Sequence, residues 1–501
     1  MKRFFSGLVI ITAVVCLIFA STVVVPSEAV EVDIVIVGAG GSGLSAAVSA
    51  ASEGASVAVL EKMPVSGGTA NFAEGLFAAE SALQREKNML ITKDFMFKII
   101  MEYSHWRANA RLVRAIVDKS PETIEWLIKQ GVEFIEPTAI YPGGLPTWHI
   151  IKGRGKAMCK TLEAKAKELG VTFYFNTPGK ELMVDEKNTV RGVVAESKSE
   201  GRVELRSKAV IIATGGFANN PEMIKQYTDF GGDLIVVGNV NKMGDGIQMA
   251  WKAGAAPLGT SVLQLYRPGI PKEGPTSQLN AAGRQPYLWV NRNGERFCDE
   301  TVIFQWPWAG NALANQQDSI MYTVFDENTK KYMMEKGIDV GVGVLVPVTT
   351  KLTQLDEDIQ RGIEKGFAFS AATVEELAAQ IKVPAGTLEE TIETYNAMCS
   401  KYRDTLFAKD SKYLQPVATA PFYAIKLFPA ILGTLGGIAI NEKTEVINQN
   451  HEVIPGLYAV GNCAGGMYGD SYDLTVPGGT LGFAVNSGRI AAENAVKYLR
   501  K

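Results

Sequence analysis

The feature that most constrains the fold is a strand–glycine–helix–strand pattern near the N-terminus. Residues 32–37 (VDIVIV) form an apolar run rich in β-branched residues, and residues 38–43 (GAGGSG) follow at once with the spacing GxGxxG. Residues 44–53 are mostly small and apolar, as in a helix that packs closely on a sheet, and residues 56–60 (SVAVL) predict a second strand that ends before Glu61. This order predicts a parallel βαβ unit of the dinucleotide-binding type.

Each glycine of this pattern has its own physical role. Gly38 permits the tight turn, Gly40 lets the backbone approach a pyrophosphate, and Gly43 lets the helix pack closely on the strand. The positive end of the helix dipole then faces the phosphates. Glu61, 18 residues after Gly43, is placed to accept hydrogen bonds from ribose hydroxyls. The alternative, a glycine-rich turn without a ligand, leaves the order of these parts unexplained.

Three later segments decide between FAD and NAD. Residues 67–75 (GGTANFAEG), residues 210–216 (VIIATGG) and residues 456–462 (GLYAVGN) each bring further glycines. Together with the first motif they can line a long, extended dinucleotide, which favours FAD. No second GxGxxG follows a strand and precedes a helix, so we do not expect a separate NAD(P)H domain.

These motifs resemble those of the fumarate reductase/succinate dehydrogenase flavoprotein superfamily, which includes aspartate oxidase, urocanate reductase and the 3-ketosteroid dehydrogenases. The resemblance covers essentially the whole chain after the first 30 residues. It implies an α/β fold with a Rossmann-like FAD-binding domain at residues 31–263 and 433–501. An α+β capping domain at residues 264–432 interrupts it. Because no histidine lies around Gly67–Gly75, we expect the FAD to be bound non-covalently.

The resemblance also implies which residues bind FAD. Asp245 belongs to a Gly-Asp-Gly element, although an ordinary turn residue is the alternative interpretation. Thr480 and Leu481 begin a helix whose N-terminus, in the family, points at the pyrimidine edge of the flavin and would stabilise an anionic reduced form. The matched positions are Gly38, Gly40, Ser42, Gly43, Glu61, Lys62, Gly67, Gly68, Thr69, Gly75, Gly215, Asp245, Asn462, Thr480 and Leu481.

Three positions argue against a dicarboxylate substrate such as fumarate. The fumarate-type enzymes of the family use an arginine to transfer the proton, and Phe304 stands at the matching place here. Gly433 replaces a family histidine, and Val476 replaces a second arginine that binds carboxylate. The sequence therefore predicts a different substrate.

Tyrosines near the C-terminus offer another proton donor. The ketosteroid dehydrogenases carry tyrosines before a similar glycine motif, where they transfer a proton and polarise a ketone. By this resemblance Tyr472 is the first candidate for the general acid and Tyr468 the second. The alternative is that both rings only pack in the core.

A second set of candidates could bind the substrate. Tyr266 and Arg267 stand where the family has a carboxylate-binding histidine, and Arg284 lies one residue from a family substrate arginine. Either arginine could hold a carboxylate through two hydrogen bonds, or could cover apolar surface instead. Trp306 and Trp308 could shape an aromatic pocket, with core packing as the alternative.

The first 29 residues predict export. Lys2 and Arg3 precede an uncharged run, Leu8–Val25, and small residues follow at 27–29, which is typical of a signal peptide. The alternative is an uncleaved anchor that holds the protein at a membrane surface. The net charge of -3 argues against a nucleic-acid partner. No CxxC or HExxH spacing is present, so we expect no metal site.

These observations predict an exported, FAD-dependent oxidoreductase. It would reduce a C=C bond conjugated to a carbonyl group, in an enoate or an enone, by hydride transfer from flavin N5. Because the sequence has no CxxCH haem motif and no NAD site, we expect electrons from a separate cytochrome or flavin carrier. The alternatives are a ketosteroid-type dehydrogenase that introduces a C=C bond, and a flavin subunit that only relays electrons.

Overall fold

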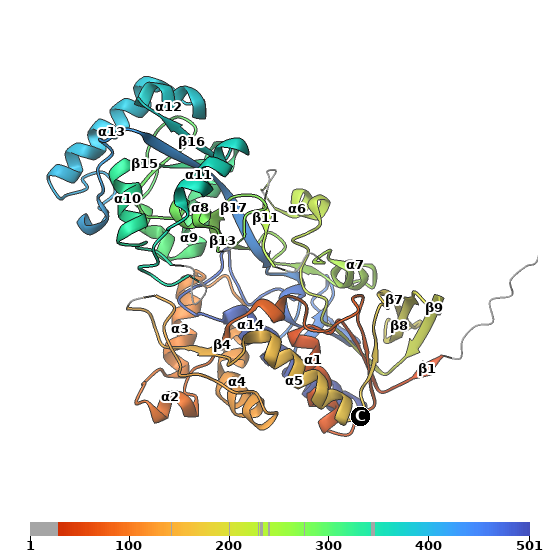
Figure 1. The fold of residues 1–501 in the computed structure, drawn as a ribbon. Helices are drawn as coiled ribbons and strands as arrows, with labels where there is room; N and C mark the ends of the chain where they lie inside the picture. The colour runs from red at the N-terminus through yellow and green to blue at the C-terminus, as the bar shows by residue number, and fades with distance from the viewer. Residues whose placement is uncertain are drawn as a thin grey trace, which may run out of the picture.

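The computed structural model describes residues 29–501 except 142, 200, 229, 231–233, 239–240, 275 and 342–345. The predicted signal peptide therefore lies, apart from its last residue, outside the described residues. Among the helices of the described part, none has both the length and the apolar composition needed to cross a bilayer. Figure 1 shows two lobes, with α10–α13 in the upper one and α1, α4, α5 and α14 in the lower one.

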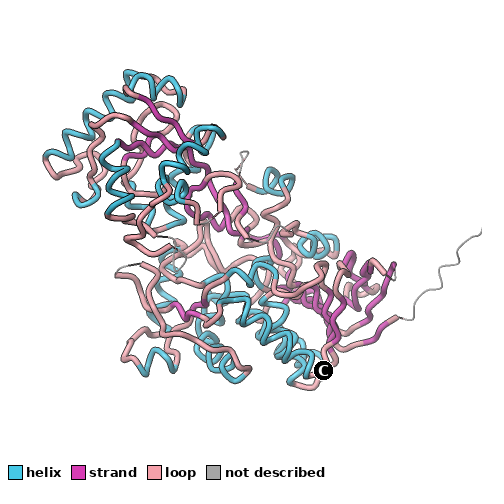
Figure 2. Tube along the Cα trace, in the orientation of Figure 1, coloured by secondary structure: helices cyan, strands magenta, loops and turns pink. Residues whose placement is uncertain are grey.

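Helices and strands occur in both lobes, as Figure 2 shows. The bounds of the helices are α1 Gly41–Ser52, α2 Ala82–Glu86, α3 Lys93–Tyr103, α4 Ala110–Lys129, α5 Arg154–Glu168, α6 Pro221–Tyr227, α7 Asp245–Lys252, α8 Gln278–Gly283, α9 Trp306–Ala314, α10 Glu327–Glu335, α11 Leu355–Glu364, α12 Val374–Ile381, α13 Ala385–Ser400 and α14 Gly479–Leu499.

A six-stranded sheet forms the centre of the lower lobe, in the order β19-β20-β10-β2-β3-β6. Neighbouring strands are parallel except for β19, which is antiparallel to β20. The chain reaches β3 from β2 through α1, as the GxGxxG pattern predicts. The strands are β2 Ile34–Val37, β3 Val57–Leu60, β6 Thr172–Tyr174, β10 Ala209–Ile212, β19 Glu445–Ile447 and β20 Val453–Ala459.

Both faces of this sheet are buried. Ile34 and Ile36 pack with α1, α5 and α14 on one face. Val35 and Val37 pack on the other face with Leu182 and the rest of a second, four-stranded sheet. A strand covered on both sides needs apolar residues at every position, which explains the continuous β-branched run. The second sheet has the order β1-β9-β8-β7 and consists of β1 Val30–Glu31, β7 Gly179–Val184, β8 Val190–Ser197 and β9 Gly201–Arg206.

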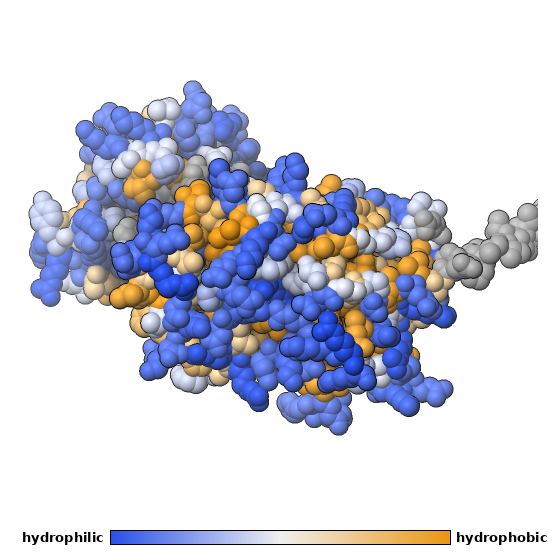
Figure 3. Space-filling view, turned by 90° about the horizontal axis from the view of Figure 1, so that it is seen from below, coloured by the Kyte–Doolittle hydropathy of each residue, from blue (hydrophilic) through white to orange (hydrophobic). Residues whose placement is uncertain are grey.

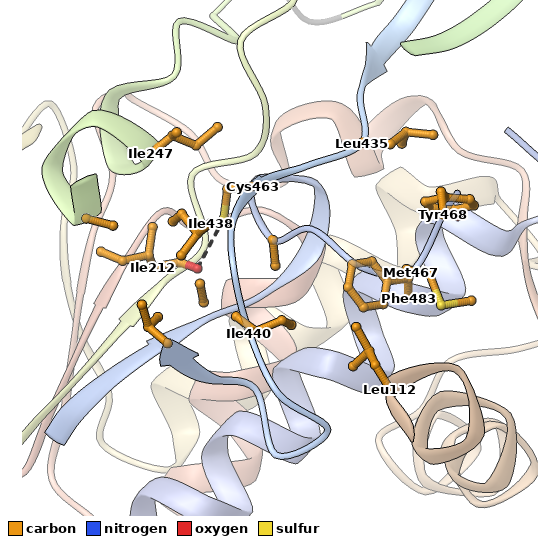
Figure 4. Packing of buried hydrophobic residues seen from close by; sticks show 14 of the residues in the cluster. Leu112, Ile212, Ile247, Leu435, Ile438, Ile440, Cys463, Met467, Tyr468 and Phe483 are labelled. Carbon is orange, nitrogen blue, oxygen red and sulfur yellow. Dashed lines mark hydrogen bonds between the residues drawn. The ribbon is translucent and has the colours of Figure 1, made fainter. Parts of the chain in front are cut away.

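The C-terminal helix α14 packs along this core. Figure 4 shows Phe483 of α14 beside Met467, with Leu112 of α4 below them and Tyr468 close by. The Cys463 thiol donates to the Ile212 carbonyl oxygen at 3.4 Å, which ties the segment before α14 to the end of β10. The N-terminus of α14 is thereby held against the same sheet edge as the first glycine motif.

The upper lobe is built around the long strand β17, Phe422–Thr434. Its first half pairs with β15 and β16, and its second half pairs with β13 and β11 near the lower lobe. The predicted domain limits at 263/264 and 432/433 fall within β13 and β17, and the division into domains stays a prediction. These strands are β11 Ile235–Val236, β13 Leu263–Gly269, β14 Leu288–Val290, β15 Met321–Asp326 and β16 Ala368–Ala371.

Two short pairings complete the fold. β4, Gly75–Phe77, is antiparallel to β5, Trp148–Ile150, and β12, Pro257–Leu258, is antiparallel to β18, Gly437–Ile438. Figure 3 shows one face of the molecule, where hydrophilic residues cover most of the surface and hydrophobic ones gather in patches. The predicted α/β class, a Rossmann-like nucleotide domain with a cap, is confirmed.

Candidate active site

A cavity lies along the edge of the central sheet where the glycine motifs meet. The space between its walls, counted together with the part open to solvent, is about 1410 Å³. Its wall comes from segments far apart in the sequence, including the first glycine loop, β17 and the start of α14. Most of the predicted cofactor residues line it: Gly38, Gly40, Ser42, Glu61, Lys62, Gly68, Thr69, Gly215, Asp245, Asn462, Thr480 and Leu481.

The other three predicted glycines lie behind this wall and keep backbones close together. A Cβ on Gly43 would lie 1.9 Å from the Gly38 carbonyl oxygen, and one on Gly75 would lie 2.3 Å from the His149 carbonyl oxygen. Gly67 has a φ of 100°, and a Cβ there would strike the Asn71 side chain. These glycines shape the cavity without facing it.

The cavity is well suited to phosphates. The N-caps of α1 and α14 are Gly40 and Gly478, and neither helix has a side chain capping its N-terminus or an acidic residue in its first turn. Their free N–H groups and dipoles are therefore available to an anion. A Cβ built on Gly40 or Gly215 would meet no atom within 4 Å, so both backbones border empty space.

Glu61 is held at the far end of the first loop. Its Oε2 accepts from the Ala39 N–H and its Oε1 from the Met63 N–H, both at 2.8 Å. Burial raises the pKa of Glu61, and the backbone donors partly offset this. Beside it, Lys62 and Asp245 form an ion pair at 2.6 Å across the cavity wall. The remaining carboxylate lone pairs can accept from ribose hydroxyls.

These features fit FAD. The glycine cradle suits a pyrophosphate, Glu61 suits a ribose, and the α14 N-terminus suits the electron-rich edge of a reduced flavin. The described residues that line the cavity include no histidine, cysteine or tyrosine, which supports the prediction of non-covalent binding. Elsewhere in the described part of the chain, no group of three or more His, Cys, Asp or Glu residues is placed to hold a metal ion.

The candidate proton donor Tyr472 lies behind the cavity wall. It is 6% exposed, and its phenol is close to the side chains of Thr480 and Gln264, both of which line the cavity. The Gln264 amide also approaches the Thr480 hydroxyl at 3.5 Å. Burial and then the nearby Asp473 carboxylate raise the pKa of Tyr472, so its phenol stays protonated. The structure thus places a protonated phenol one side chain away from the cavity.

Tyr468 and Tyr472 lie together, with ring centroids 5.7 Å apart. The Tyr468 hydroxyl is buried and has no hydrogen-bond partner. Asp473, the residue after Tyr472, is 4% exposed, and its Oδ2 is likewise buried without a partner. Burial raises the pKa of Asp473 to about 6. The sequence analysis missed Asp473, since an acid in a polar segment is typical of an exposed loop.

The arginine candidates are both buried in the cap near the cavity. Arg267 stacks on Trp306, with its guanidinium carbon 3.7 Å from the ring centroid, and donates to the Gly341 carbonyl oxygen. Arg284 donates to the Pro268 carbonyl oxygen at 2.6 Å. Neither forms an ion pair with a described residue, and Arg267 Nε and Arg284 Nη1 have no partner. The interpretation that they cover surface does not fit this burial.

Aromatic rings surround Arg267. Tyr266 and Trp306 meet edge to face at 5.2 Å. Trp308, at 44% exposed, lies nearer the surface and donates to the Tyr103 hydroxyl at 2.9 Å. Tyr103 in turn donates to the Tyr472 carbonyl oxygen at 2.9 Å, so α9 of the cap is linked to the tyrosine segment of the lower lobe.

Lys242 is a second residue that the sequence analysis missed. It lines the cavity, and its Nζ donates to the carbonyl oxygens of Val237 at 3.0 Å and Leu432 at 2.7 Å. Burial lowers its pKa to about 8. Its position just before the Gly-Asp-Gly element was the only signal in the sequence.

Comparison with known proteins assigns the family. The model of the FAD binding domain family matches residues 33–475. A vinyl phenol reductase from Lactiplantibacillus plantarum is 37% identical over 93% of this chain and 96% of its own length. A fumarate reductase (cytochrome) from Shewanella frigidimarina is 29% identical over 94% of this chain and 78% of its own.

A solved structure agrees with these matches. The 3-ketosteroid-Δ4-(5α)-dehydrogenase from Rhodococcus jostii, in complex with 4-androstene-3,17-dione, has a TM-score of 0.73 and 26% identity, over 95% of this chain and 98% of its own. The predicted superfamily and the predicted FAD are confirmed. The chain therefore belongs to the FAD binding domain family and is an FAD-dependent oxidoreductase of the kind that acts on C=C and CH–CH bonds.

Proposed function

We propose that this protein reduces a C=C bond that is conjugated to a carbonyl group or to an aromatic ring, and that Tyr472 supplies the proton. FAD, when bound, supplies the hydride. The observation that supports the proposal is the position of the Tyr472 phenol, close to the side chains of Thr480 and Gln264, which both line the FAD cavity. Addition across a double bond requires a proton donor beside the hydride donor.

The substrate side favours an aromatic or enone compound over a small dicarboxylate. Phe304, Gly433 and Val476 stand where the resemblance to fumarate-type enzymes would require an arginine, a histidine and a second arginine. Tyrosine and tryptophan rings are present instead, at Tyr266, Trp306, Tyr468 and Tyr472. The 37% identical relative is named for a vinyl phenol, whose double bond is conjugated to an aromatic ring.

The reverse reaction is the second candidate. The tyrosine pair and the likeness to a 3-ketosteroid dehydrogenase structure both support a protein that introduces a double bond beside a ketone. In that direction a tyrosine accepts a proton, whereas the pKa of Tyr472 is raised, which favours the protonated form and hence reduction.

Export and an external electron donor belong to the same proposal. Lys2, Arg3 and the uncharged Leu8–Val25 support a signal peptide at residues 1–29. Without a haem motif or an NAD motif in the sequence, the electrons for FAD would come from a separate cytochrome or flavin carrier. An uncleaved N-terminal segment would instead hold the protein at a membrane surface.

The test is a substrate panel with the purified holoenzyme reduced by dithionite. We expect reoxidation of the flavin by enones, enoates or vinylarenes, and little by fumarate.

In Tyr472→Phe we expect kcat to fall about 100-fold or more with FAD content unchanged, because the proton donor is lost. Tyr402→Phe is the control, since Tyr402 is 78% exposed in the cap. Unchanged turnover in Tyr472→Phe would remove the proposed acid. Faster reduction of the oxidised flavin by saturated ketones than reoxidation by alkenes would favour the dehydrogenase.

A further inference from the structure

We propose that Tyr468 and Asp473 form a binding site for a phenolic hydroxyl group, so that the substrate is a C=C bond conjugated to a hydroxyphenyl ring. This inference rests on the proposed function and names the substrate class of the same site. It assigns a role to two buried polar groups that the folded chain leaves unused.

The two groups stand out because both are buried and unpaired. Tyr468 is 8% exposed and Asp473 is 4% exposed. The Tyr468 hydroxyl and Asp473 Oδ2 have no hydrogen-bond partner, whereas Asp473 Oδ1 is fixed by the N–H of Thr475 at 2.7 Å and by its hydroxyl. A buried polar atom without a partner is costly, so such atoms are expected to meet a ligand or ordered water.

Both groups lie next to the place where the chemistry occurs. The Tyr468 hydroxyl is 3.3 Å from the position that a Cβ on Gly479 would take, at the N-terminus of α14. The next two residues of that helix, Thr480 and Leu481, line the FAD cavity. Tyr472 packs against the Tyr468 ring, and its phenol lies close to the Thr480 side chain. The unpaired atoms and the proposed proton donor therefore belong to one compact group.

The charge of this group selects a hydroxyl over a carboxylate. Burial raises the pKa of three neighbouring phenols, those of Tyr103, Tyr468 and Tyr472, and the Asp473 carboxylate adds to the rise in each. With its own pKa near 6, Asp473 is mainly ionised at pH 7. A carboxylate ligand would be repelled by it. A phenol can donate its O–H to Asp473 Oδ2 and accept from the Tyr468 hydroxyl, which satisfies both groups.

The site also gives the hydroxyl a chemical role. Tyr472 gives its proton to the terminal vinyl carbon of the substrate. The phenolic proton moves to Asp473. The electron pair of the broken O–H bond shifts through the ring, which forms a neutral quinone methide. The benzylic carbon then accepts the hydride, the ring becomes aromatic again, and Asp473 returns its proton to the oxygen. One hydride and one proton have been added across the double bond, and Tyr472 is reprotonated from solvent.

The first experiment measures binding. The oxidised holoenzyme is titrated with 4-ethylphenol and with 4-ethylanisole, which lacks the O–H, while the flavin absorbance is recorded. We expect Asp473→Asn to weaken 4-ethylphenol binding about tenfold or more and to leave 4-ethylanisole binding unchanged. Tyr468→Phe should show the same selective loss, and it decides the matter if Asp473→Asn does not fold, because it removes only an unpaired hydroxyl.

Asp470→Asn is the matched control for binding. Asp470 lies in the same segment but is exposed and pairs with Arg107 at 3.3 Å. We expect this variant to bind 4-ethylphenol like the wild type. Wild-type affinity for 4-ethylphenol in both Asp473→Asn and Tyr468→Phe would overturn the inference, as would equal affinity of the wild type for the two ligands.

The second experiment measures turnover and separates this inference from the proposed function. With reduced enzyme, we expect 4-vinylphenol to react about 100-fold or more faster than 4-methoxystyrene, because a site built for a hydroxyl rejects the analogue without one. If enones or enoates react and 4-vinylphenol does not, the proposed function stands and this inference falls. If no alkene reacts while 4-ethylphenol binds through Asp473, the hydroxyl site stands and the proposed function falls.

Discussion

Among the buried charged residues that the structure describes, two groups are satisfied very differently. In the cap, Arg296 pairs with Glu300 at 2.7 Å and with Asp404 at 2.7 Å, and Lys409 pairs with Glu300 at 3.2 Å. These four side chains are 0–2% exposed, and two positive charges meet two negative ones. We call them the paired cluster.

The second group borders the proposed active site. Arg267, Arg284 and Asp473 are similarly buried, but none forms an ion pair with a described residue, and each has a polar atom without a partner. We call them the unpaired group. Although Arg296 Nη1 also lacks a partner, its charge is balanced within the paired cluster.

Whether a buried charge has a partner indicates whether it serves the stability of the fold or the binding of a ligand. Desolvating a charge costs several kcal/mol, and only close, well-aligned partners offset it. The paired cluster offsets that cost internally, so it can hold residues 296–300 and the 404–409 segment of the cap together, and Lys409 also donates to the Tyr395 hydroxyl of α13. The unpaired group does not, and a structure that retains such a cost at a cavity is expected to recover it when a ligand binds.

The largest effect is expected when the paired cluster is broken. Arg296→Met leaves Glu300 and Asp404 buried, with Lys409 as the one cation that remains beside Glu300 among the described residues. We expect the free energy of unfolding to fall by about 3–5 kcal/mol in urea titrations. The kcat of the remaining folded protein should not change.

Arg292→Met is the matched control for that variant. Arg292 pairs with Asp318 at 2.6 Å, but the two side chains are 33% and 53% exposed. Removing an exposed pair should cost about 0–1 kcal/mol. Equal losses in the two variants would show that burial does not distinguish the paired cluster.

The same contrast explains how much the sequence could predict. The nucleotide end of the cavity is made by backbone, and its glycines, strands and Glu61 are close in sequence, so spacing alone indicates them. A strand that is buried on both faces of its sheet also needs apolar residues at every position, and such a run can be recognised in the sequence. FAD and the α/β fold could therefore be predicted from local patterns.

The substrate end could be predicted only in part. Tyr472 and Arg267 were singled out through a family resemblance, but the positions of their side chains depend on β13, β17 and the turn before α14, which are distant in the chain. Asp473 carried no signal, because burial and a missing partner are properties of the tertiary structure. A polar acid between two apolar segments predicts an exposed turn until its neighbours are known.

The second prediction concerns the unpaired acid and pH. The pKa of Asp473 is raised from 3.8 to about 6 in the folded protein, so the folded state holds its proton more tightly than the unfolded state. Stability is therefore lost as the pH rises from about 4 to above 6, by roughly 2–3 kcal/mol. Asp473→Asn has no charge to desolvate.

Thermal unfolding at two pH values tests whether the stability of the wild type falls as the pH rises. We expect Asp473→Asn to have a higher Tm than the wild type at pH 8 and a similar Tm at pH 4. The described titratable groups that face Asp473 are Tyr103, Tyr468 and Tyr472, which remain neutral throughout this range. Asp470→Asn, at an exposed position, should show little pH-dependent difference. A lower Tm for Asp473→Asn at pH 8 would mean that the carboxylate has an internal partner.

The smallest effect on stability is expected at Arg267, although its burial matches that of Arg296. Arg267→Met removes a guanidinium whose pKa burial lowers to about 10, and it also removes the stacking on Trp306 at 3.7 Å. The relief of desolvation and the lost cation–π contact should nearly cancel, so we expect the free energy of unfolding to change by no more than about 1 kcal/mol.

The effect of Arg267→Met on substrate binding should instead be selective. We expect KM for unsaturated acids to rise about tenfold, while KM for neutral enones stays unchanged, because only an acid can use the unpaired cation. A loss of stability as large as that of Arg296→Met, with no difference between acids and neutral enones, would place Arg267 among the residues that hold the fold.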